Sequence, residues 1–207
     1  IIAELSANHN HSIKTAKATI TAAREVGADA IKLQTYTADT LTIDSDQEYF
    51  KIRGGLWDGR SLYELYEDAH TPWDWHPELF DHAHSLGLEI FSSPFDRTSV
   101  DFLENLKVPI YKIASFEIQD IPLIEYVASK GKPLIISTGI AALEDIELAL
   151  STCRTAGNNQ ITLLKCTSAY PAPMEEANLL TIPDMRERFG VEIGLSDHTM
   201  GSSSAIA

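Results

Sequence analysis

Short apolar runs alternate with stretches of helical periodicity along the whole chain, and this alternation restricts the fold more than any other feature. The runs are rich in β-branched residues and do not alternate with polar ones, as expected for strands buried on both faces of a parallel sheet. Seven such runs are present, at residues 1–5, 30–36, 89–95, 110–115, 133–139, 161–168 and 192–198. We therefore predict an α/β protein, namely a TIM (β/α)₈ barrel, with a doubly wound sheet as the alternative. A full barrel has eight strands and about 250 residues, so this chain of 207 residues is expected to be truncated after about seven βα units.

The segments between the runs have the 3.6-residue period of amphipathic helices. In the first of them, Ile13, Ala16, Ile20 and Ala23 fall on one face. One stretch, residues 41–76, breaks the pattern, since it is acidic and aromatic and separates the second strand from its helix. A loop of this length inside a compact domain is usually functional, although a decorated edge is equally consistent with the sequence.

The charge of the chain restricts its partners. A net charge of −14 argues against nucleic acid, because phosphate binding requires clustered Lys and Arg. No apolar run approaches the roughly 18 residues of a membrane span, and the start of the chain lacks the regions of a signal peptide. Cys153 and Cys166 have no metal-ligand spacing and suit a reducing compartment. We expect a cytoplasmic protein that binds neither nucleic acid nor membrane, and the missing initiator Met predicts that the chain begins inside a longer protein.

Polar residues gather where the predicted strands end, which is where parallel α/β proteins bind their ligands. Every one of the seven runs carries such residues, and packing alone does not account for so many. They are Glu4, Lys32, Gln34, Ser92, Ser93, Lys112, Ser115, Ser137, Thr138, Lys165, Thr167, Ser168, Ser196, Asp197 and His198.

Two of these lysines are the leading candidates for binding an anion. A buried ammonium requires an anionic partner or a shifted pKa. Lys32 and Lys112, with the hydroxyls of Ser93 and Ser115, are suited to hold a phosphate and a carboxylate. Internal ion pairs are the alternative, and the available carboxylates are those of Glu4 and Glu117.

The remaining candidates depend on strand register or on partners. Lys165 points either to the same face as the other lysines or outward, because a shift of one residue reverses the face of a strand. His198, which follows Ser196 and Asp197, is a candidate metal ligand, although a single histidine is more often a hydrogen-bonding residue.

The strand ends also resemble, in the same order, those of the sialic acid synthase family. The matching segments are IIAELSANH at residues 1–9, IKLQTY at 31–36, FSSPF at 91–95, YKIAS at 111–115, STG at 137–139, CTSAYP at 166–171 and GLSDH at 194–198. They span nearly the whole chain. Ser6 and the loop at residues 54–60 resemble the pseudaminic acid branch of the family, and the N-acetylneuraminate and legionaminic acid branches are the alternatives.

The resemblance implies a metal-dependent condensation of phosphoenolpyruvate with the aldehyde of an open-chain acetamido sugar. Carbon C3 of phosphoenolpyruvate attacks the aldehyde, a divalent ion (Mn²⁺ or Mg²⁺) polarises it, and water addition at C2 releases phosphate by C–O cleavage. For the pseudaminic branch, the implied sugar is 2,4-diacetamido-2,4,6-trideoxy-L-altrose.

The family's functional positions fall on residues of this chain. Those implied for phosphoenolpyruvate are Lys32, Ser93, Lys112, Ser115, Ser168 and Ser196, and Ser168 stands where the neuraminate enzymes have Asn. Those implied for the remaining substrate contacts are Gln34, Tyr170 and Asp197. The implied catalytic residues are Glu117, Lys112 and Glu4, of which Glu117 handles a proton or orients water. His198 is implied as a metal ligand, with Glu4 beside the metal.

The resemblance also implies how the whole protein is organised. We interpret residues 1–207 as one phosphoenolpyruvate-binding barrel domain, incomplete at its C-terminus. The second metal-binding histidine, the eighth strand and an antifreeze-like (SAF) domain, which closes the partner's site in a domain-swapped homodimer, are expected beyond residue 207. In the long loop, Trp57 and Arg60 are candidates for shaping the sugar pocket or the dimer contact.

Two other classes of protein stay open at this point. A Schiff-base aldolase would use Lys112 or Lys165 as its nucleophile and need no metal. A non-catalytic sugar-binding barrel would keep the aromatic loop but have no need for inward-facing lysines beside Glu117 and His198.

Overall fold

The computed structural model describes residues 1–55 and 57–206. Leu56, which belongs to the predicted loop motif at residues 54–60, and Ala207 lie outside the described residues. The chain divides into two compact units, Ile1–Val108 and Pro109–Ala207.

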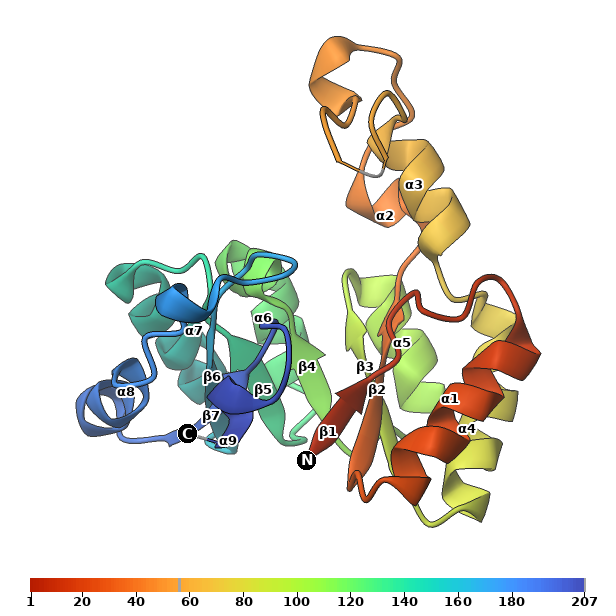
Figure 1. Ribbon diagram of the computed structural model, residues 1–207. Coiled ribbons are helices and arrows are strands. Elements are labelled where there is room, and N and C mark those ends of the chain that lie inside the picture. The colour runs from red at the N-terminus through yellow and green to blue at the C-terminus, as the bar shows by residue number, and fades with distance from the viewer. Residues whose placement is uncertain (56, 207) are drawn as a thin grey trace. The chain divides into compact units, whose positions relative to one another are not determined.

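The first unit is built on three parallel strands that pair in chain order, as the sequence predicts. They are β1 (Ile2–Glu4), β2 (Ala30–Thr35) and β3 (Glu89–Pro94). Its main helices are α1 (Ile13–Glu25), α4 (His76–Ser85) and α5 (Arg97–Asn105) (Figure 1). The predicted apolar face of α1 is confirmed, because Ala16, Ile20 and Ala23 are buried and α1 packs against α4.

Residues 41–76 are not one continuous loop, so the prediction for this stretch is wrong. It contains α3 (Leu62–Ala69), follows the short α2 (Ala38–Leu41), and includes the 3₁₀ turns η1 (Glu48–Phe50) and η2 (Trp73–Trp75). Ser61 begins α3 through a capping box: its hydroxyl accepts from Glu64 N at 3.1 Å, and the Glu64 carboxylate accepts from Ser61 N at 3.0 Å. Figure 1 shows α2 and α3 extending away from β2 and β3.

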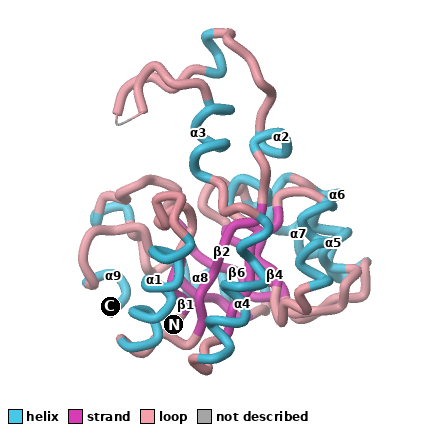
Figure 2. The backbone as a smooth tube through the Cα atoms, turned by 90° about the vertical axis from the view of Figure 1, so that its right-hand side faces the viewer, coloured by secondary structure: helices cyan, strands magenta, loops and turns pink. Residues whose placement is uncertain are grey.

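The second unit continues the βα pattern with four parallel strands in chain order. They are β4 (Tyr111–Ile113), β5 (Leu134–Ser137), β6 (Ile161–Cys166) and β7 (Glu192–Ser196). Its helices are α6 (Ile121–Ala128), α7 (Leu143–Thr155), α8 (Thr181–Phe189) and α9 (Ser203–Ile206), with 3₁₀ turns η3 (Ser115–Gln119) and η4 (Met174–Glu176). Figure 2 marks the helices in cyan and the strands in magenta along the backbone. None of the helices described is long and apolar enough to cross a membrane.

A buried hydrogen bond connects α4 to β2. His76, the first residue of α4, is fully buried, and its Nε2 lies 2.9 Å from the Thr35 hydroxyl. The Thr35 hydroxyl also contacts that of Ser92 at 2.6 Å. Burial lowers the pKa of His76 to about 4, because the protonated ring would lose its hydration.

Acidification from pH 6.5 to about 4 is expected to destabilise the protein through His76 by about 3 kcal/mol. Between these values the unfolded chain binds a proton that the folded protein excludes, so the free energy of unfolding falls as the pH falls. Urea unfolding of the wild type and of His76→Gln across this range measures the effect. The difference between the two pH slopes isolates His76, because all other groups titrate in both proteins. Equal slopes would contradict the prediction.

Candidate active site

Four predicted site residues of the first unit share one face of its sheet. The strand register pairs Glu4 with Lys32 and Gln34 with Ser93, and side chains two residues apart lie on the same side of a strand. We call these four residues the β1–β3 cluster. The Lys32 ammonium forms an ion pair with Glu4, and the Lys32 side chain is 13% exposed. The predicted alternative for Lys32, an internal pair with Glu4, is therefore present in the structure.

One group in the β1–β3 cluster has no partner in the described structure. The Ser93 hydroxyl is buried and makes no hydrogen bond there. A buried hydroxyl without a partner costs about 1–3 kcal/mol, so it is suited to a ligand oxygen. Beside it on β2, the Gln34 amide oxygen accepts a hydrogen bond from Ser6, which has φ of +48° at the end of β1.

A second group of predicted residues gathers in the second unit. Lys112 is 5% exposed, and its ammonium donates to the Ser137 hydroxyl at 2.6 Å and to the Ile113 carbonyl at 2.8 Å. The register places Ser137 and Ser196 on the same sheet face as Lys112. We call the set Lys112, Ser115, Ser137, Gly139, Ser168 and Ser196 the β4–β7 cluster. The sequence predicts Ser137 only as a strand-end residue, and in the structure its hydroxyl accepts a hydrogen bond from Lys112.

Gly139 lies close to two hydroxyls of the β4–β7 cluster, although the sequence predicts no role of its own for it. A Cβ at this position would lie 2.3 Å from the Ser168 hydroxyl, 2.9 Å from that of Ser115 and 3.0 Å from the Cys166 sulfur. The following amide, Ile140 N, donates to the Ser115 hydroxyl at 3.1 Å. Glycine is therefore required by the close approach of hydroxyls around one point, which is the arrangement expected of a small-anion site.

Gly139→Ala is expected to weaken binding of phosphoenolpyruvate, the ligand that the family resemblance implies, by about tenfold or more, because the new methyl displaces Ser168 and Ser115. Overpacking of this kind typically costs about 1–3 kcal/mol. Titration calorimetry with phosphoenolpyruvate measures the loss, and Gly157→Ala is the matched control. A Cβ at Gly157 would meet no atom within 4 Å, but this residue has φ of +86°, so its variant loses stability without losing affinity. Unchanged affinity in Gly139→Ala would contradict the role of the cluster.

Glu117, near this cluster, has a carboxylate oxygen without a hydrogen-bond partner in the described structure. Its Oε2 is buried and makes no hydrogen bond among the residues that the structure describes. Burial raises the pKa of Glu117, and the nearby charge of Lys112 offsets only part of this effect. A carboxyl group that stays protonated to a higher pH is suited to give and take a proton.

His198 lies just beyond β7 and is oriented by the loop after β6. Its Nδ1 is 2.9 Å from the Thr167 carbonyl, and its ring lies 4.4 Å from that of Tyr170. Its Nε2 is 3.5 Å from the Ser196 hydroxyl. Asp197, predicted to contact substrate, uses Oδ1 to accept from Thr199 N at 2.9 Å, which stabilises the turn after β7.

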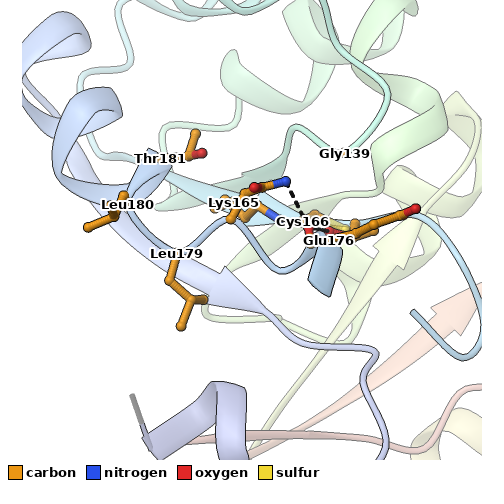
Figure 3. Close-up of a pocket in the computed structure, with 9 residues that line it drawn as sticks. Gly139, Lys165, Cys166, Glu176, Leu179, Leu180 and Thr181 are labelled. Carbon is orange, nitrogen blue, oxygen red and sulfur yellow. Dashed lines mark hydrogen bonds between the residues drawn. The ribbon is translucent and has the colours of Figure 1, made fainter. Parts of the chain in front are cut away.

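Lys165 does not belong to either cluster. The register pairs Lys165 with Leu195 and Cys166 with Ser196, so Lys165 points to the face opposite Ser196 and Lys112. It is 7% exposed and lines a pocket with Glu176 and residues 178–181, and this pocket also reaches Gly139 of the β4–β7 cluster (Figure 3). The outward register considered from the sequence is the one observed.

The described residues contain no group of three His, Cys, Asp or Glu side chains that could hold a metal ion. His198 nevertheless fits one ligand of such a site. A carbonyl only accepts, so the Thr167 carbonyl holds a proton on Nδ1, and Nε2 is the ring nitrogen on the side of the Ser196 hydroxyl.

These features define the class of the protein: an α/β protein of parallel βα units whose strand ends carry buried cations and hydroxyls. The chain belongs to the NeuB family, whose model matches residues 19–207. It is 54% identical to the pseudaminic acid synthase of Helicobacter pylori and 50% identical to that of Campylobacter jejuni, over 98% and 97% of this chain. The chain spans 59% of the length of each of these two relatives.

A solved structure confirms the predicted barrel fold class. The N-acetylneuraminic acid (sialic acid) synthetase of Leptospira borgpetersenii, crystallised in complex with citrate, superimposes with a TM-score of 0.86 at 29% identity. The match covers 98% of this chain and 66% of that one.

Proposed function

We propose that the protein is a pseudaminic acid synthase. It joins phosphoenolpyruvate to 2,4-diacetamido-2,4,6-trideoxy-L-altrose and water, and it releases a nine-carbon nonulosonic acid and phosphate. The observation that carries the proposal is the β4–β7 cluster, where the hydroxyls of Ser168 and Ser115 approach Gly139 and the buried ammonium of Lys112 is bound by Ser137. The two synthases from Helicobacter and Campylobacter support the choice of branch, since their identity to this chain is well above that of the neuraminic acid enzyme.

The family positions for phosphoenolpyruvate fall on residues of each cluster. Lys32 and Lys112 are the proposed cations for its phosphate and carboxylate, and hydroxyl groups are the proposed hydrogen-bond donors. The hydroxyls proposed are those of Ser93, Ser115, Ser168 and Ser196. The unsatisfied Ser93 hydroxyl and the close approach to Gly139 support this assignment.

Glu117 is the proposed proton carrier of the reaction. As C3 of phosphoenolpyruvate forms a bond to the aldehyde carbon, the aldehyde oxygen takes the proton of Glu117. The resulting carboxylate then accepts a proton from the water that adds to C2. Cleavage of the bond between C2 and the phosphate oxygen, with transfer of the C2 hydroxyl proton to the departing phosphate, gives the ketone and phosphate. The raised pKa and the unsatisfied oxygen of Glu117 support this role. Gln34 and Tyr170 are proposed to contact the sugar, and Asp197 is proposed to contact substrate from the turn after β7.

A divalent ion, Mn²⁺ or Mg²⁺, would be held by His198, with Glu4 beside it directly or through water. When bound, it supplies Lewis acidity for the aldehyde oxygen. The orientation of the His198 ring supports its part in this site.

The proposal is tested by phosphate release from phosphoenolpyruvate with a panel of acetamido sugars. We expect turnover with the 2,4-diacetamido-L-altrose sugar and little with N-acetylmannosamine or the legionaminic acid precursor. A preference for either of the latter would reassign the branch. Trapping of a pyruvate adduct by borohydride, with activity insensitive to EDTA, would instead indicate a Schiff-base aldolase, and binding of sugar without phosphoenolpyruvate would indicate a non-catalytic protein.

The segment between α2 and α3 is proposed to contribute to sugar selection. Trp57 is 48% exposed, so its ring is available to a deoxy-sugar methyl or to a partner subunit. Arg60, in contrast, pairs with Asp68 and donates to the Glu64 carbonyl at 3.1 Å. We therefore expect Trp57→Ala to raise the sugar KM about tenfold with phosphoenolpyruvate affinity intact, and Arg60→Ala to lower Tm instead. Loss of stability without a KM change in Trp57→Ala would make this segment purely structural.

We further infer that residues 1–207 form one phosphoenolpyruvate-binding barrel domain and that the protein works as a domain-swapped homodimer in the cytoplasm. The two free, buried cysteines, Cys153 and Cys166, are consistent with a reducing compartment. Light scattering of the full chain measures the oligomeric state, and a monomer with full activity would contradict the dimer.

A further inference from the structure

Lys165 is a buried lysine that the proposed reaction does not use. Its ammonium donates to the Thr167 hydroxyl at 2.7 Å and reaches the Glu176 carbonyl at 3.5 Å. No ion pair in the described part of the chain includes it, whereas Lys32 pairs with Glu4. A buried ammonium held only by neutral oxygens is costly to desolvate, so a purely stabilising role would be served better by an apolar side chain.

Lys165 forms hydrogen bonds with the segment that follows β6. The Thr167 hydroxyl donates to the Glu176 carbonyl at 3.1 Å, and the Asn178 amide donates to the same carbonyl at 3.1 Å. Figure 3 shows Lys165 beside Glu176, joined by a hydrogen bond. Lys165, Thr167 and Glu176 therefore connect the start of the segment after β6 to the 3₁₀ turn η4 within it, eleven residues from Lys165 along the chain.

Thr167 connects this group to the other face of the sheet. Its side chain binds Lys165 and Glu176, and its carbonyl is the acceptor for His198 Nδ1 at 2.9 Å. The same loop contacts His198 a second time, because Ala172 N donates to the His198 carbonyl at 2.9 Å. The position of the Thr167 peptide group thus sets the orientation of the imidazole and the nitrogen that carries its proton.

We propose that Lys165 is a positioning residue for His198. Its ammonium holds Thr167 so that the Thr167 carbonyl keeps His198 in the Nδ1–H tautomer, in which Nε2, 3.5 Å from the Ser196 hydroxyl, is the nitrogen that would bind a divalent cation. Carbonyls that accept from the second nitrogen of a histidine ligand typically contribute 10- to 100-fold to metal affinity. The inference rests on the proposed function, because it takes His198 as a metal ligand.

The test uses the full chain and two direct readouts. Electron paramagnetic resonance with Mn²⁺ alone gives the dissociation constant, and long-range ¹H–¹⁵N spectra of the imidazoles give the tautomer of His198, assigned with His198→Gln. We expect Lys165→Met to weaken Mn²⁺ binding about tenfold and to reduce the Nδ1–H population, with phosphoenolpyruvate affinity unchanged. Thr167→Val keeps the carbonyl but removes the hydroxyl, so it should also lower the Mn²⁺ affinity and the Nδ1–H population. It replaces Lys165→Met if that variant does not fold. Lys14→Met, at an exposed position of α1, is the matched control.

A double-mutant cycle separates positioning from a general loss of structure. In the His198→Gln background, Lys165→Met should have no further effect on Mn²⁺ affinity. An equal loss in both backgrounds, or an unchanged His198 tautomer in Lys165→Met and Thr167→Val, would overturn the inference. If the wild type binds no Mn²⁺, the proposed metal site fails, whereas the tautomer measurement still decides whether Lys165 orients His198.

Discussion

Lys112→Met is expected to weaken phosphoenolpyruvate binding by about 2–5 kcal/mol, or roughly 30- to 5,000-fold, which is the range for removing one partner of a buried charge pair. Lys112 is 5% exposed, and its ammonium is fixed by Ser137 and Ile113 on the face that carries the β4–β7 cluster. Methionine keeps the length and apolar stem of lysine but removes the positive charge that offsets the cost of desolvating the phosphoenolpyruvate trianion. Titration calorimetry with phosphoenolpyruvate measures the change.

Lys32→Met is the companion experiment. The loss should be smaller than for Lys112, because the ammonium of Lys32 is already paired with Glu4 in the free protein. Lys14→Met controls for the loss of one positive charge from a protein with net charge −14. Unchanged affinity in both Lys32→Met and Lys112→Met, with the proteins folded by circular dichroism, would refute the assignment of phosphoenolpyruvate to these lysines.

Removal of metal is expected to abolish activity completely. EDTA should stop phosphate release, and added Mn²⁺ should restore it, because the acetamido aldehyde requires a Lewis acid in the proposed reaction. His198→Ala should weaken Mn²⁺ binding by more than about 100-fold, since loss of a direct ligand exceeds the 10- to 100-fold effect of an outer partner. Phosphate release and Mn²⁺ paramagnetic resonance measure the two effects separately.

A histidine that belongs to neither cluster provides the control for this experiment. His84→Ala changes a residue of α4 whose ring contacts Phe80, and it should leave Mn²⁺ affinity unchanged. Full activity and stoichiometric Mn²⁺ in His198→Ala would remove His198 from the metal site. Activity that survives EDTA in the wild type would exclude metal dependence altogether.

The order of strands and helices could be predicted from local sequence, because strands that are buried on both faces of a parallel sheet have continuous apolar, β-branched sequences. Each of the seven apolar runs contains a strand of the structure, from β1 at Ile2–Glu4 to β7 at Glu192–Ser196. Asp120 caps α6 as a short-range signal would suggest, accepting from Leu123 N at 3.0 Å. The candidate residues were found because parallel strands end on one side of a sheet. The exception was α3, where the capping signal of Ser61 and Glu64 was present but the surrounding polarity favoured a loop.

Which face each candidate reaches was decided only by tertiary structure. Lys112 and Lys165 are both lysines in apolar runs. Strand pairing places them on opposite faces of the sheet, where Lys112 contacts Ser137 and Lys165 contacts Thr167. The sequence could not show that Gly139 is required by contact distance, because Ser168 and Ser115 reach it from other segments of the chain. Local composition determines which segments become strands, since that depends on neighbours in sequence. Register and packing determine which polar atoms meet, since those contacts join residues that are distant along the chain.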